Sequence, residues 1–86
     1  MSKFDGALIK EQGVTFAIAM VKGHVFNNPN REQIRNQFSV LFGNVPVVLA
    51  RNTSGGRIEY HGRNDLVKFL SRIHTSQIPW KSYTLS

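Results

Sequence analysis

The stretch that decides the fold is residues 45–74, with the sequence VPVVLARNTSGGRIEYHGRNDLVKFLSRIH. Its first six residues are almost all apolar and predict a buried strand, with Pro46 near the start, where a strand tolerates proline. Asn, Thr, Ser and two glycines at positions 52–56 predict a turn. Residues 57–61 alternate between polar and apolar, which is typical of a half-exposed strand at a sheet edge. The stretch therefore predicts two strands joined by a turn.

An amphipathic helix is expected directly after these two strands. Asn64 is placed to cap it, and Asp65 favours its start because a carboxylate is stabilised at the positive end of a helix dipole. Lys68 and Arg72 fall on its outer side. Its apolar stripe repeats at helical spacing and consists of Leu66, Phe69, Leu70 and Ile73.

Another amphipathic helix is predicted between Asn30 and Gly43. Asn30 and Gln33 have the spacing of a capping box, and Glu32 favours the helix start. Gly43 is typical of the residue that ends a helix. The apolar stripe of this helix is Ile34, Phe38, Leu41 and Phe42.

The N-terminal part of the chain supplies further strands. Residues 14–21 are bounded by glycines and are apolar on both faces, which predicts a central strand covered on both sides rather than a short helix. A short strand is expected at residues 7–9, after a frayed end at residues 1–6. Residues 77–86 are too apolar for a free tail, so we expect them to dock as a C-terminal arm, one form of which is an added strand.

The predicted order of elements is ββαββα followed by the arm. It predicts a single domain over residues 1–86 with an α+β fold. The expected architecture is a two-layer sandwich, in which two helices pack on one mostly antiparallel sheet and the C-terminal arm docks against it. A chain of 86 residues can form one hydrophobic core.

Composition narrows the classes of function. The chain has no cysteine, so it can form no disulfide, zinc–thiolate site or reactive thiol. Hydrophobic residues make up 41% and charged residues 19%, which favours a folded domain over a disordered one. The longest apolar stretch, residues 14–21, is too short to span a bilayer, and the first residues lack the pattern of a signal peptide. We therefore expect a cytoplasmic protein without membrane contact.

The second half of the chain resembles a known fold family. Val45-Pro46 is similar to the position where thioredoxin-fold proteins carry a proline, usually with a cis peptide, before an inner strand. The stretch 45–73 would then be the C-terminal strand–strand–helix of that fold. The paired cysteines of the family would lie at residues 23–30, and this chain has none there. The resemblance thus implies a thioredoxin-like fold that has no redox activity and serves a binding or scaffold role.

The balance of charge favours anionic partners. Eleven Lys and Arg against five Asp and Glu give a net charge of +6, and basic domains of this kind attract nucleic acid. Guanidinium groups suit phosphate because they donate two parallel hydrogen bonds. The candidate phosphate contacts are Arg31, Arg35, Arg51, Arg57, Arg63, Lys68 and Arg72. The competing interpretation, which the pattern favours, is that these charges only face solvent.

Aromatic residues near these charges suggest stacking with bases. Tyr60, Trp80 and Tyr83 lie close in sequence to basic residues, a mixture that suits single-stranded nucleic acid. The favoured alternative is that Tyr60 and Trp80 belong to the core and keep only their polar tips at its rim.

Signals for catalysis or metal binding are weak. Residues 53–56 contain two glycines but lack the lysine and helix of a phosphate-binding loop, so they predict a hairpin loop. His24, His61 and His74 are scattered, which argues against a metal site, and no cofactor is expected. No nucleophile, base and orienting group can be grouped from the sequence, so we expect no enzymatic activity.

These observations favour a small, non-enzymatic binding protein. Its expected partner is another protein or a second copy of the chain, contacted through the arm, the edge strand at 57–61 or the small face of Thr15, Ala17 and Ala19. The first alternative is a nucleic-acid-binding module. The second is a cysteine-less remnant of a thioredoxin-like protein.

Overall fold

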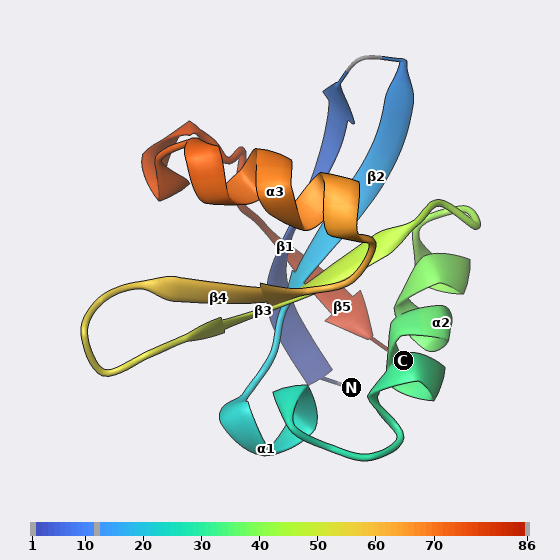
Figure 1. Ribbon diagram of the computed structural model, residues 1–86. Helices are drawn as coiled ribbons and strands as arrows, with labels where there is room; N and C mark the ends of the chain where they lie inside the picture. Colours follow the sequence, from blue (N-terminus) through green and yellow to red (C-terminus); the bar gives the residue numbers. More distant parts are fainter. Residues whose placement is uncertain (1, 12, 86) are drawn as a thin grey trace.

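The computed structural model describes residues 2–11 and 13–85. At its centre is one five-stranded sheet with the strand order β4-β3-β2-β1-β5 (Figure 1). The strands are β1 (Ser2–Glu11), β2 (Val14–Met20), β3 (Val47–Asn52), β4 (Ile58–His61) and β5 (Lys81–Leu85). The helices are α1 (Gly23–Phe26), α2 (Arg31–Leu41), α3 (Asn64–Arg72) and a short 3-10 helix, η1 (Thr75–Gln77).

Neighbouring strands run antiparallel except at one place. β2 and β3 are parallel, because the segment with α1 and α2 carries the chain back along the sheet between them. β1 and β2 form an antiparallel pair, as do β3 and β4. The expected α+β class, with two main helices packed on a mostly antiparallel sheet, is confirmed. The predicted edge strand is also confirmed, since β4 ends the sheet on one side.

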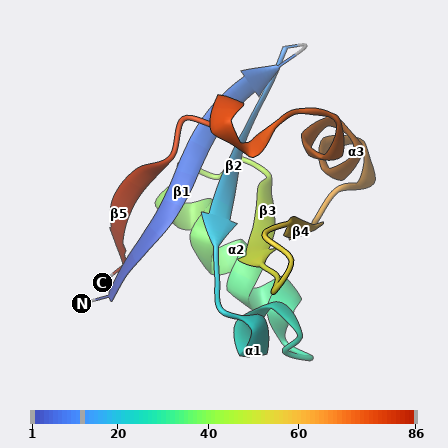
Figure 2. The ribbon, with the colours of Figure 1, turned by 90° about the vertical axis from the view of Figure 1, so that its left-hand side faces the viewer.

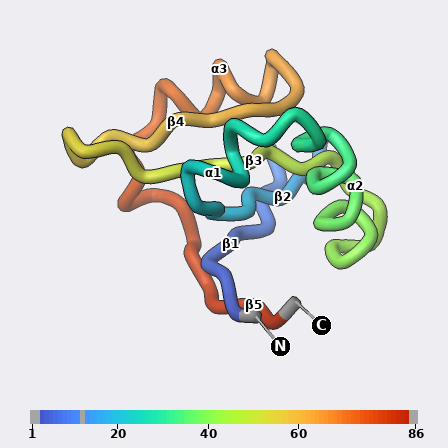
Figure 3. Tube along the Cα trace, turned by 90° about the horizontal axis from the view of Figure 1, so that it is seen from below, coloured from blue at the N-terminus to red at the C-terminus, as the bar shows by residue number. Residues whose placement is uncertain are grey.

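The two main helices cover opposite faces of the sheet. α3 contributes Leu70 to the apolar cluster that contains Phe16, whereas α2 contributes Phe38 to the cluster that contains Ala17. Seen from below, α3 and α2 lie to different sides of the strands (Figure 3). The centre of the molecule therefore has three layers, where the order of elements suggested two. The reason is that successive side chains of β2 point to opposite faces and both sets are apolar.

The central strand is covered on both sides, as its composition predicted. Residues 16–19 of β2 are fully buried. The small side chains of Ala17 and Ala19 pack in one cluster with Phe26 of α1 and Phe38 of α2. The small face of this strand therefore receives helices of the same chain.

The C-terminal arm docks as a strand. β5 pairs antiparallel with the first half of β1, from Ser2 opposite Leu85 to Gly6 opposite Lys81. Residues 2–6 are thus part of the sheet, and the prediction of a frayed end there was wrong, because it ignored the strand that the C-terminus supplies. The two ends of the chain lie side by side (Figure 2). Met1 and Ser86 lie outside the described residues.

The helix ends differ from the prediction in detail. Asn30 precedes α2, but its side chain makes no capping hydrogen bond, so the predicted capping box with Gln33 is absent. Instead, the backbone N–H of Asn30 donates to the side-chain oxygen of Asn28 at 2.8 Å. α3 begins at Asn64 itself, one residue earlier than expected. Gly43 follows α2 with a φ of 84°, a conformation that glycine adopts without strain.

Residues 45–73, on which the expected resemblance to thioredoxin-fold proteins was based, contain β3, β4 and α3. The described residues contain no cis peptide bond, so the peptide before Pro46 is trans, unlike the one that the resemblance implied. The place of the paired cysteines is taken by α1 and the loop after it.

The helices are short. α2, the longest of them, has 11 residues, whereas a bilayer requires about 20 apolar residues. Across residues 2–11 and 13–85, no helix is both long and apolar enough to cross a membrane.

Candidate functional site

Three of the seven basic residues predicted to contact phosphate form ion pairs within the chain. These pairs are Arg35 with Glu32 at 2.6 Å, Arg63 with Asp65 at 2.7 Å, and Arg51 with Glu59. The pKa of Asp65 is lowered by its hydrogen bonds from Arg63, whose own pKa is raised by the same contact. Part of the charge that suggested a polyanion partner is therefore neutralised by neighbouring carboxylates.

Two of the seven predicted residues, Arg51 and Arg31, also contact α1. Arg51 lies over the ring of Phe26, 5.3 Å from its centroid, a distance at which a cation is attracted to the aromatic face. Arg31 donates to the backbone carbonyl of Phe26 at 3.4 Å. Both residues thus stabilise the α1 segment on this face of the sheet.

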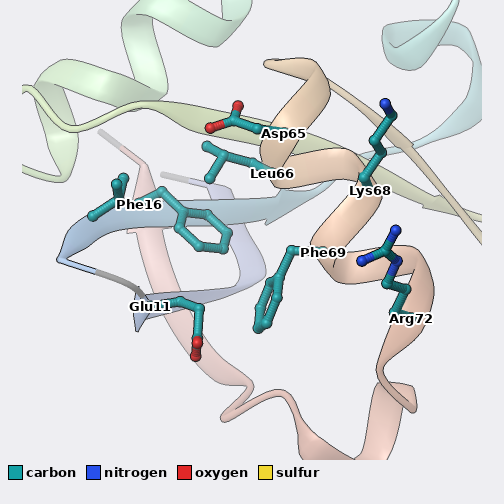
Figure 4. Close-up of a pocket in the computed structure, with 8 residues that line it drawn as sticks. Glu11, Phe16, Asp65, Leu66, Lys68, Phe69 and Arg72 are labelled. Carbon is teal, nitrogen blue, oxygen red and sulfur yellow. The ribbon is translucent and has the colours of Figure 1, made fainter.

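The basic residues of α3 lie on the other face. Lys68 and Arg72 line a cavity of about 280 Å³ between α3 and the β1–β2 hairpin (Figure 4). Its floor includes the rings of Phe16 and Phe69, which meet edge to face with centroids 6.3 Å apart. The seven predicted residues therefore do not share one surface, because α2 carries Arg31 and Arg35 to one side of the sheet and α3 carries Lys68 and Arg72 to the other.

The cavity beside α3 holds charges of both signs. Glu11 and Asp65 line it together with Lys68 and Arg72 (Figure 4). Asp65 is already paired with Arg63, so Glu11 stands beside the two cations and the lining carries one excess positive charge. The cavity is slightly smaller than the sites of about 300–1,000 Å³ that hold most small ligands.

The three aromatic residues predicted to stack with bases are separated as well. Trp80 is half-buried against the α3-side cluster and donates its indole N–H to the carbonyl of Thr75 at 3.3 Å. Tyr83 lies in β5, with its ring stacked on Phe4 at 5.6 Å. Tyr60 lies in β4, at the opposite edge of the sheet. The interpretation of Trp80 as a core residue with its polar tip at the rim agrees with its half-buried position, whereas the hydroxyl of Tyr60 is buried and not at the rim.

The hydroxyl of Tyr60 is buried and has no hydrogen-bond partner among the described residues. Burial raises the pKa of this phenol, because the charged form loses its hydration. The ring packs against the same apolar cluster as Trp80. Tyr60 is therefore a packing residue of the sheet edge.

Two of the three histidines, His61 and His74, make contacts that hold the fold. His61 on β4 lies 2.6 Å from Glu32 on α2, and this contact ties the start of α2 to the sheet edge. His74 caps η1 by accepting from the N–H of Ser76, and Gln77 completes the capping box. His74 and Gln77 have the spacing of a capping box in the sequence, but a helix of three residues is too short to be predicted from its periodicity. Within the described residues no three His, Asp or Glu side chains gather as metal ligands.

The Glu32–His61 contact gives a testable pH dependence. The hydrogen bond from His61, helped by Arg35, lowers the pKa of Glu32 below its ordinary value of 4.5. A lowered pKa in the folded state means that the ionised carboxylate stabilises the fold above about pH 4.5 and that this stabilisation is lost as the pH falls through the folded pKa. Because Glu32 is exposed, this stabilisation of the fold is about 0–1 kcal/mol.

We expect the titration midpoint of Glu32, followed by carbon NMR of its carboxyl group, to move up toward 4.5 in the His61→Ala variant. The unfolding free energy of that variant should depend less on pH between about 3 and 5. His24→Ala, at an exposed position on α1, serves as the control. Equal Glu32 midpoints in the wild type and His61→Ala would contradict the contact.

Exposed apolar residues at the end of α2 were missed from the sequence. Val40 is 70% exposed and Leu41 42% exposed, although Leu41 was assigned to the buried stripe of this helix. That assignment was wrong, because α2 turns mainly Phe38 and Phe42 toward the sheet. Phe42 directly follows the exposed pair and packs edge to face on Tyr83 of β5, with centroids 4.9 Å apart.

The apolar end of α2 therefore adjoins the β5 edge of the sheet. β5 is a terminal strand, so one side of its backbone faces away from the sheet. β4 ends the sheet on the other side, but it has only four residues and is flanked by Arg57 and Arg63. β5 carries one charged residue, Lys81, at its start. Of the two edges, β5 is thus the less protected against pairing with another strand.

No protein-family model, curated protein or solved structure matches this chain.

Proposed function

We propose that the chain is a non-enzymatic protein-interaction module that pairs with a second copy of itself through β5. The observation that carries this proposal is the free edge of β5 together with the exposed Val40 and Leu41, which directly precede Phe42, the residue that packs on Tyr83 of β5. The backbone of an edge strand supplies unpaired hydrogen-bonding groups, and the apolar end of α2 supplies surface that is favourable to remove from water. A five-residue strand alone buries too little area for a stable dimer, so both parts are needed.

The sequence of β5 suits pairing with its own copy. An antiparallel pair centred on Tyr83 places Ser82 opposite position 84 and Lys81 opposite position 85 of the second copy. The two Lys81 residues then stand about 14 Å apart along the strands, which is more than the screening length at physiological salt. The one charged residue of the strand therefore does not oppose the pairing.

The dimer should respond to salt in the opposite way from a nucleic-acid complex. Each copy carries a net charge of +6, so the two copies repel each other and added salt screens this repulsion. We expect sedimentation equilibrium to show a dimer whose dissociation constant falls as the salt concentration rises from 50 to 500 mM. Binding to phosphates would instead weaken steeply over this range.

The matched substitutions are Leu41→Asp and Leu8→Asp. Leu8 is 48% exposed and lies in the part of β1 that β5 does not cover, so both variants place the same charge at a similarly exposed apolar position. Leu41→Asp should weaken the dimer at least about tenfold, because the carboxylate would be buried at the interface. Leu8→Asp should leave it unchanged.

A chain that stays monomeric at high concentration and high salt would overturn this proposal, as would equal effects of the two variants. Saturable binding of oligonucleotides at low salt, without a dimer, would favour the nucleic-acid alternative.

A further inference from the structure

A groove lies where the start of β1 and the end of β2 meet α1 and α2. It encloses about 400 Å³, which is within the range of small-molecule sites. Its walls are mostly apolar and are formed by Phe4, Met20, Val21, Val25, Ile34 and Phe38. Most of these side chains are only partly buried, so the groove exposes apolar surface that a ligand could cover.

Two lysines stand together at the rim of this groove. Lys3 lies near the start of β1 and Lys22 two residues after the end of β2, and both line the groove. Both side chains are exposed, and neither forms an ion pair with another described residue. Two like charges beside one space repel each other, and an anion bound between them would relieve this repulsion.

The lysines also separate an apolar space from a polar one. Beyond them lies a second space of about 510 Å³, which Lys3 and Lys22 line together with Asp5, Asn52 and Ser82. A ligand with its apolar part in the groove would thus place its other end between the two ammonium groups, next to polar side chains. Among the residues that the structure describes, Asp5 is the one carboxylate that lines this second space, and it disfavours a highly charged headgroup there.

We propose that this groove binds a small organic acid, with an apolar body against Phe4 and Phe38 and a single carboxylate between Lys3 and Lys22. The ammonium groups would donate charge-assisted hydrogen bonds to the carboxylate. The apolar body would be removed from water by the walls of the groove. The two proposals can fail independently, because Leu41→Asp changes the dimer surface without touching the lining of the groove, and Val25→Phe changes the groove without touching β5 or the end of α2.

The experiment tests the full chain with three probe molecules that differ in whether they have the apolar body, the carboxylate or both. Octanoate has both parts, 1-octanol has the apolar body without the charge, and acetate has the charge without the body. Calorimetry should show saturable binding of octanoate, binding of 1-octanol at least about tenfold weaker, and no saturable binding of acetate. Amide NMR shifts caused by octanoate should gather at Phe4, Val21 and Val25.

Two charge variants with equal net charge test the lysines. Lys3→Gln combined with Lys22→Gln removes the pair at the groove, whereas Lys10→Gln combined with Lys68→Gln removes two exposed lysines elsewhere, on β1 and α3. The first variant should lose at least about tenfold in octanoate affinity, and the second should keep wild-type affinity. Emission of Trp80, which lies in the cluster on the other face, checks that each variant is folded.

A third variant, Val25→Phe, fills the groove with a larger side chain and should abolish octanoate binding while both lysines remain. The proposal is overturned if octanoate fails to saturate, if 1-octanol binds as tightly as octanoate, or if the two lysine variants behave alike.

Discussion

Replacing Phe16 by alanine should destabilise the fold by about 3–5 kcal/mol. Phe16 is fully buried in β2 and packs edge to face on Phe69 of α3. Its removal leaves a cavity between the sheet and α3 that a close-packed core cannot fully close. A domain of 86 residues has a total stability of about 4–13 kcal/mol, so this one change could remove most of it.

Urea denaturation followed by circular dichroism measures this loss. Leu8→Ala is the control, since Leu8 lies on the neighbouring strand of the same sheet but is 48% exposed. We expect the control to change stability by less than about 1 kcal/mol. If the two alanine variants unfolded at the same urea concentration, the assignment of Phe16 to the core would be wrong.

The second large effect is expected at Gly6, where a side chain has no room. A methyl group on this residue would lie 2.8 Å from the backbone carbonyl oxygen of Ile18 and 3.2 Å from the ring of Tyr83. Gly6 pairs with both β2 and β5, so the clash would push apart strands on its two sides. Gly6→Ala should therefore cost about 1–3 kcal/mol, the usual penalty for overpacking.

Gly55→Ala is the matched control, because nothing lies within 4 Å of the methyl group that it would introduce. This change should be neutral, or stabilise the fold by about 0.4–1 kcal/mol by restricting the unfolded chain. The free energies of unfolding from urea titrations of both variants provide the measurement. A Gly6→Ala variant as stable as Gly55→Ala would show that β1, β2 and β5 are not packed as described.

How far the candidate sites could be predicted depended on the distance between their parts in the sequence. Arg35 and Glu32 are one helical turn apart, so their pairing could be expected from spacing alone. The pairs of Glu32 with His61 and of Arg51 with Glu59 join different elements, and the sequence held no sign of them. The sequence therefore suggested that all of these basic residues were free to bind phosphate, although three of them form ion pairs with carboxylates of the same chain.

The exposure of Leu41 at the end of α2 could not be predicted from the sequence for the same reason. Helical spacing placed Leu41 and Phe42 on one stripe, but a helix on a twisted sheet can turn only part of such a stripe inward. The contact of Phe42 with Tyr83 decided which residue was covered. Tyr83 is 41 positions further along the chain, so its place beside α2 depends on the docking of β5.

The sequence by itself determined the types and order of the four main strands and two main helices, the positive charge and the absence of thiol chemistry, because periodicity and composition are local properties. Only the tertiary structure decided that α2 and α3 lie on opposite faces, that residues 2–6 join the sheet, and that Lys3 and Lys22 line one groove. Each of these depends on contacts between residues far apart in the sequence, which are set by the packing of the whole sheet.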